Sequence, residues 1–154
     1  MPEHVDWFQW FLAFFEKVKD HFAVVLDAAG CWEGWLQGEM FLQGRHGRDM
    51  TLFTNHPGVL NEGFADLFAV AHPPMVGEIK IVSAEGTVMD SAIEKDVRRL
   101  RDRRVTATEA YMVLVIPKSE KQTKLGYRLE KLHYSDQHVE RDYGAFKVRI
   151  WRIE

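Results

Sequence analysis

Two carboxylates and one ammonium group stand close together in this sequence, in an arrangement that suits phosphoester chemistry. Glu78 and Lys80 are two residues apart, and Asp66 precedes Glu78 by twelve residues. Side chains alternate along a β-strand, so Glu78 and Lys80 share one face of the segment 75–82. The other residues of both faces are apolar, which predicts a strand buried on both sides. Charged groups at such a place need compensation, and a divalent metal ion bound by the carboxylates would supply it.

A third acid, Glu39, lies in a predicted helix over residues 31–43. Its neighbours on one helical stripe are apolar: Trp32, Trp35, Leu36 and Leu42. A carboxylate in the middle of such a stripe is unusual unless it has a partner. Carboxylate oxygens favour hard ions such as Mg²⁺ or Mn²⁺. The sequence therefore predicts a metal site with Asp66 and Glu78 as ligands, and with Glu39 as a further ligand or as a residue that orients one.

The elements that must position these residues follow from periodicity and turn signals. Helices are predicted over residues 5–27, 31–43 and 91–104, the last of them starting at a capping box formed by Ser91 and Glu94. Strands are predicted over residues 50–54, 64–71, 75–82 and 110–117, and a turn over 55–58. Residues 125–134 and 146–153 both alternate and are expected to pair as a C-terminal β-hairpin across the polar segment 135–144.

With Asp66 on one strand and Glu78-Ile79-Lys80 on the next, residues 31–117 resemble the PD-(D/E)XK nucleases, the restriction-endonuclease-like superfamily. The core of that family runs helix, three strands, helix, strand. Ala65 stands where the strict motif has proline. The resemblance implies an α/β fold with a three-layer core, a central mixed sheet with helices on both faces. The extra C-terminal β-hairpin would extend this core.

We expect one domain over residues 1–154, made of an N-terminal aromatic helix (1–30), the nuclease-like core (31–117) and C-terminal strands (118–154). The resemblance implies a metal-dependent phosphodiester hydrolase, an endonuclease-like enzyme of the repair, resolvase or mobile-element type that acts on DNA. Its catalytic residues would be Asp66, Glu78, Lys80 and Glu39. Lys80 would orient the attacking water or stabilise charge on the phosphate.

Charge is distributed unevenly along the chain. Residues 1–94 hold 5 Lys and Arg against 14 Asp and Glu, whereas residues 95–154 hold 15 against 9. This asymmetry suits a metal site beside a phosphate-binding surface. Predicted nucleic-acid contacts are Lys95, Arg98 and Arg99 in the helix, and Lys147 and Arg149 in the last strand. The alternative is that these residues belong to solvated faces with acidic partners nearby.

Other features concern partners and location. The helix over residues 7–22 has more apolar surface than one sheet face needs, which predicts a homodimer. Its apolar run, residues 7–15, is far shorter than the ~18 to 20 residues of a membrane span, so no membrane is expected. The single cysteine, Cys31, excludes an internal disulfide, and the acidic start lacks a secretory n-region. Both features predict a cytoplasmic protein.

Two further interpretations of the charged residues stay open. The chain could be a catalytically inactive member of the same fold that binds nucleic acid or a protein. Alternatively, Glu78 and Lys80 could form a buried structural ion pair in an unrelated α/β protein.

Overall fold

The computed structural model describes residues 3–27, 32–46, 50–82, 86–118 and 132–154. Within these ranges the chain is an α/β protein with a six-stranded mixed sheet and three helices. The elements, in chain order, are α1 (Trp7–Leu26), α2 (Trp32–His46), β1 (Thr51–Pro57), β2 (Phe64–Val70), β3 (Met75–Ile81), α3 (Gly86–Arg101), β4 (Glu109–Pro117), β5 (His138–Asp142) and β6 (Phe146–Ile153).

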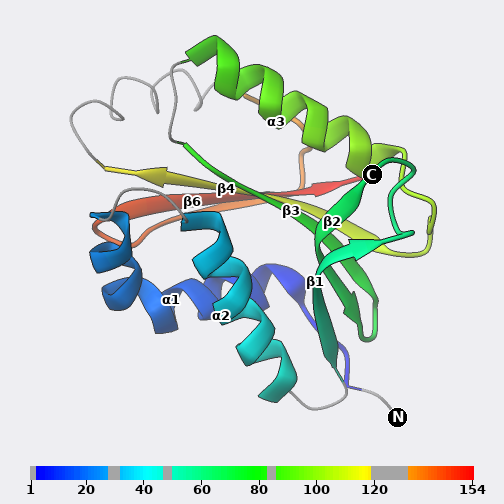
Figure 1. Cartoon of the computed structure of the whole chain (residues 1–154), viewed down its shortest axis with the longest axis horizontal. Coiled ribbons are helices and arrows are strands. Elements are labelled where there is room, and N and C mark those ends of the chain that lie inside the picture. The colour runs from blue at the N-terminus through cyan, green and yellow to red at the C-terminus, as the bar shows by residue number, and fades with distance from the viewer. Residues whose placement is uncertain (1–2, 28–31, 47–49, 83–85, 119–131) are drawn as a thin grey trace.

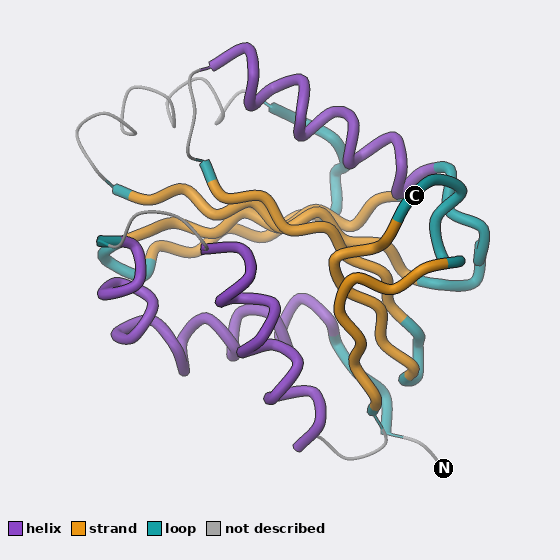
Figure 2. The backbone as a smooth tube through the Cα atoms, viewed as in Figure 1, coloured by secondary structure: helices purple, strands orange, loops and turns teal. Residues whose placement is uncertain are grey.

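The strands are ordered β1-β2-β3-β4-β6-β5 across the sheet. β3 and β4 are parallel and are connected through α3, while all the other neighbouring pairs are antiparallel. α1 and α2 cover one face of the sheet and α3 covers the other (Figures 1 and 2). The expectation of a mixed sheet with helices on both faces is therefore confirmed.

β3 is buried on both faces, as its sequence predicts. Ile79 and Ile81 pack in the core beneath α1 and α2, whereas Val76 and Val82 pack in the core beneath α3. Glu78 lies on the α3 face and exposes only 1% of its surface. A carboxylate at this depth depends on the groups around it, because water does not solvate it.

α1 begins at an Asp6 N-cap, whose side chain accepts a hydrogen bond from the Gln9 amide. The helix turns its aromatic stripe inward, and Phe11, Phe15 and Phe22 are fully buried in the protein's own core. The excess apolar surface that predicted a homodimer is thus used within one chain, and the dimer has no structural support. No helix in the described ranges is long and apolar enough to cross a membrane.

α2 lies close to β1, and Gly44 permits this approach. A Cβ at Gly44 would stand 2.5 Å from the Cβ of Leu52 in β1. Leu36 and Met40 are buried on the same side of the helix. This packing sets the rotation of α2 about its axis and therefore decides which of its polar residues face the sheet.

The structure corrects several predicted boundaries. α3 starts at Gly86, so Ser91 lies inside the helix and the predicted capping box does not mark its start. β1 continues through the predicted turn to Pro57, because its pairing with β2 resumes in the same register after Asn55, which has a φ of 50°. In the C-terminal hairpin the partner of β6 is β5, inside the segment predicted as a connection. Residues 132–134 of the predicted strand are not in a strand, and residues 125–131 lie outside the described ranges.

Candidate active site

Asp66 and Glu78 meet where β2 separates from β3. The last paired residues of these strands are Leu67 and Gly77, so Asp66 and Glu78 are the first to face each other beyond the ladder. Their carboxylates replace the missing strand partners: the Ile79 amide donates to Asp66 Oδ2 (2.8 Å), and the Asp66 amide donates to Glu78 Oε2 (3.3 Å). A backbone amide at such a fork needs an acceptor, and the two acids provide it.

α2 supports the same fork from the other side. Gln37 donates from its side-chain nitrogen to the Asp66 carbonyl (3.2 Å) and to Asn55 Oδ1 (3.2 Å). The Glu33 carboxylate accepts a hydrogen bond from the Ile81 amide (3.3 Å), two residues beyond Ile79 on the same free edge of β3. The open edge of β3 is therefore lined by carboxylates from β2 and α2.

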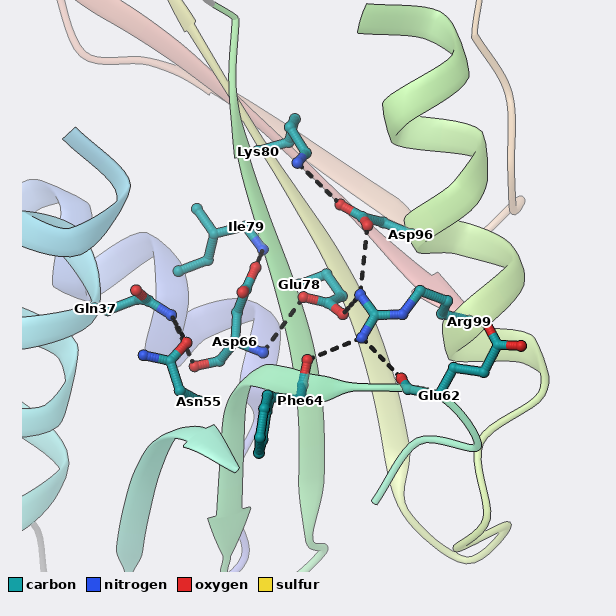
Figure 3. Close-up of polar contacts among 10 residues, drawn as sticks. All are labelled: Gln37, Asn55, Glu62, Phe64, Asp66, Glu78, Ile79, Lys80, Asp96 and Arg99. Carbon is teal, nitrogen blue, oxygen red and sulfur yellow. Dashed lines mark hydrogen bonds and ion pairs between the residues drawn. The ribbon is translucent and has the colours of Figure 1, made fainter. Parts of the chain in front are cut away.

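The cationic partners come from α3 and from β3 itself (Figure 3). Arg99 Nη1 lies 2.8 Å from Glu78 Oε1 and 3.7 Å from Asp96 Oδ1, and Lys80 Nζ lies 3.4 Å from Asp96 Oδ2. Glu78 and Lys80, whose direct ion pair was one of the open alternatives, each pair with a residue of α3 instead. Asp96 connects the two cations, so one helical turn of α3 holds both charged residues of β3.

Arg99 also ties the loop before β2 to this cluster. Its Nη2 donates to the carbonyls of Glu62 (3.0 Å) and Phe64 (2.9 Å). Gly63, between them, has a φ of 67°, and a Cβ there would lie 3.1 Å from Nη2. Glycine suits this turn because it adopts positive φ and leaves room for the guanidinium. Arg99, predicted as a nucleic-acid contact, already makes these contacts within the protein.

The electrostatics of Glu78 reflect crowding of acids in a buried place. Burial, a side-chain hydrogen bond with Asp66 and the charges of Asp66 and Asp96 together raise the pKa of Glu78 to about 10, although Arg99 lowers it. Two adjacent carboxylates at one site favour sharing a proton over ionising together. A second cation at the fork would remove this conflict.

The neighbouring groups show the same imbalance. Burial raises the pKa values of Glu33 and Asp96, even though Lys80 opposes the shift in both. Burial lowers the pKa of Lys80, but Asp96 and Glu33 outweigh it, so the net shift is upward. Lys80 therefore remains an ammonium at neutral pH.

The helical acid at the site is Glu33, and Glu39 has no described contact with the cluster. The stripe used to predict Glu39 faces the core only in its first half: Leu36 is buried and Trp32 and Trp35 pack against the core, but Leu42, beyond Glu39, is 50% exposed. The inward stripe of α2 consists of Glu33, Leu36, Gln37, Met40 and Gly44, an i, i+3, i+4, i+7, i+11 pattern that was visible in the sequence. Asp96 was also missed, although it lies between the apolar stripe residues Ile93 and Leu100, the same type of signal that drew attention to Glu39.

The other predicted nucleic-acid contacts divide into two groups. Lys95 and Arg98 are exposed on α3 beside the cluster. Lys147 and Arg149 of β6 pair with Glu140 of β5 at 3.7 Å and 2.8 Å, and Arg149 also lies 5.7 Å from the centre of the Trp151 ring. The two β6 residues are therefore engaged in cross-strand contacts within the sheet.

The donor set at the fork suits a hard divalent cation. Glu33, Asp66, Glu78 and Asp96 against Lys80 and Arg99 leave two negative charges in excess when all are ionised. In the described ranges, no group of three or more His, Cys, Asp or Glu side chains could hold a metal ion. Two carboxylates are nevertheless what Mg²⁺ usually takes from a protein, because it keeps several waters and binds substrate phosphate. The residues present fit such an ion and do not form an all-protein cage.

Comparison of the chain with models of known protein families, with curated protein sequences and with solved structures finds no match.

Proposed function

We propose that this protein is a metal-dependent phosphodiester hydrolase that acts on nucleic acid, with DNA as the expected substrate, on a restriction-endonuclease-like core. The observation that carries the proposal is the meeting of Asp66 and Glu78 at the β2–β3 fork, with the Lys80 ammonium on the same strand as Glu78. The element order from α2 through β1, β2, β3, α3 and β4 also matches the order that the resemblance implies.

In this proposal Asp66 and Glu78 would hold a Mg²⁺ or Mn²⁺ ion, with Glu33 lining the same edge. A bound divalent ion lowers the pKa of a coordinated water and neutralises charge on the phosphate. Lys80 stays protonated because of Asp96, so it suits donation to phosphate oxygens and not acceptance of a proton. Arg99 fixes Glu78 Oε1, which leaves Oε2 on the side of Asp66.

Cleavage assays test the proposal. The full chain is incubated with supercoiled, single-stranded and branched DNA in Mg²⁺, Mn²⁺ or EDTA, together with the variants Asp66→Asn and Glu78→Gln. Glu16→Gln, an exposed change on α1 across the sheet, is the matched control. We expect metal-dependent cutting that falls by ~100-fold or more in both site variants and is unchanged in the control. Cutting that survives in both variants, or no cutting of any substrate, contradicts the hydrolase.

A nucleic-acid-binding protein without activity is the second candidate. The observation that favours it is that Glu78 and Lys80 are already paired with Arg99 and Asp96, so the cluster is held together within the chain. Under this alternative, DNA binds equally well in EDTA and in Mg²⁺, and no substrate is cut.

A further inference from the structure

A groove runs along α3 next to the candidate site. It consists of two adjoining hollows of about 370 Å³ and 410 Å³, and both are lined by Glu62, Lys95 and Arg99. The first hollow extends to Asp102 near the end of the helix, and the second extends to Lys80. One wall is α3 and the other is the loop that enters β2, which Arg99 holds in place (Figure 3). The groove therefore leads to Lys80, Asp96 and Arg99, the last of which pairs with Glu78.

The cationic side chains of this groove differ in whether they already have an acidic partner. Lys80 and Arg99 have ion pairs with Asp96 and Glu78. Lys95 and Arg98 are exposed, and neither side chain is joined by a hydrogen bond or ion pair to any other residue in the described part of the chain. They are three residues apart on one helix, so their side chains are neighbours. These two are the groove's cations whose side chains have no partner within the described ranges, so they are free to contact an anion.

The volume of the hollows limits the size of the anion that can bind in them. Each has the volume of a pocket for a small organic molecule, on the scale of one nucleotide. Neither can enclose a duplex, whose major groove alone is about 12 Å wide. Glu62 and Asp102 also line the first hollow and oppose a purely electrostatic association, so a fitted strand is favoured over loose attraction of any polyanion.

We infer that this groove binds an unpaired nucleic-acid strand, with Lys95 and Arg98 contacting phosphates on the path to Lys80. The inference rests on the proposed function for the direction of the strand, but its test does not depend on cleavage. Arg99, although it also lines the groove, acts by positioning Glu78 and the loop and makes no phosphate contact.

Equilibrium binding tests the groove. Fluorescence anisotropy in EDTA compares a labelled single-stranded oligonucleotide with the same sequence as a duplex, over a range of salt concentrations. The variants are Lys95→Gln and Arg98→Gln, and Arg101→Gln on the other flank of α3 is the matched control. We expect the single strand to bind more tightly than the duplex. Each groove variant should weaken that binding about tenfold and lower the salt slope by roughly 0.7. The control should match the wild type.

Several results would overturn the inference. These are a duplex that binds as tightly as the single strand, groove variants that keep the wild-type affinity and salt slope, or a wild-type protein that binds no strand. Arg99→Gln, which removes the charge, separates positioning from contact: we expect an unchanged salt slope, and a slope lowered by roughly 0.7 would make Arg99 a phosphate contact. Groove-dependent binding without cleavage would keep this inference and end the hydrolase. Cleavage that is unchanged in the Lys95 and Arg98 variants would end this inference and keep the hydrolase.

Discussion

Replacing Glu78 with Gln should make the metal-free protein more stable at neutral pH. The pKa of Glu78 is raised from its ordinary 4.5 to about 10 in the folded state, chiefly by burial and by Asp66. A group whose pKa is higher in the folded state contributes stability that is complete below 4.5 and is lost as pH rises toward 10. Glutamine resembles the protonated carboxyl in shape and has no proton to release, so the variant escapes this loss.

The size of the effect follows from the pH interval. At pH 7 the unfolded chain has released the Glu78 proton and the folded chain has kept it. Each pH unit above 4.5 favours the unfolded state by 1.36 kcal/mol, which amounts to on the order of 3 kcal/mol at pH 7. Any fraction of Glu78 that Arg99 keeps ionised in the folded state reduces this figure. At pH 4 the two proteins should be equally stable.

Urea denaturation of the wild type, Glu78→Gln and the control Glu16→Gln at pH 4, 7 and 9 in EDTA measures these differences. The control should stay within ~0.5 kcal/mol of the wild type, because exposed pairs contribute little. Repeating the pH 7 series with Mg²⁺ at about 100 times its Kd should stabilise the wild type by ~2.7 kcal/mol and leave the variant unchanged. A Glu78→Gln protein that is less stable than the wild type at pH 7 refutes the reasoning, since Glu78 would then be an ionised structural partner of Arg99.

Three further predictions concern the residues around the fork. Glu33→Gln should weaken Mg²⁺ binding, measured by calorimetry, by roughly 10- to 100-fold, and Glu39→Gln should have a far smaller effect. Equal losses of Mg²⁺ affinity in the two variants would place Glu39 at the site as well. Arg99→Lys should lower the free energy of unfolding by about 1 to 3 kcal/mol, because an ammonium cannot hold Glu78 and two carbonyls in the same geometry; an unchanged urea midpoint would show that these contacts contribute nothing. Gly63→Ala should lower the free energy of unfolding by about 1 to 2 kcal/mol, because Gly63 has a positive φ and lies next to the Arg99 guanidinium. Gly34→Ala in α2, with open space around it, should raise the free energy of unfolding by up to ~1 kcal/mol, and the opposite order of the two variants in thermal melting would contradict the role of the Gly63 turn.

Local periodicity was sufficient to predict the strand that carries Glu78 and Lys80. Alternation along β3 placed both on one face, and apolar neighbours on both faces indicated burial. The stripe of Ile93, Val97 and Leu100 likewise identified the buried side of α3. These features depend on residues a few positions apart, whose relative directions are set by backbone geometry.

The partners of those residues depend on the tertiary structure. The rotation of α2, set by its packing against β1, brings Glu33 to the edge of β3 and leaves Glu39 without a described contact there. The crossing of α3 over β3 decides that Glu78 meets Arg99 and Lys80 meets Asp96. The sequence alone determined that Glu78 and Lys80 share one face of β3 and that Glu78 lies in an apolar, buried strand. Which groups compensate them was decided by how separate elements pack, because contacts between distant segments leave no periodic trace along the chain.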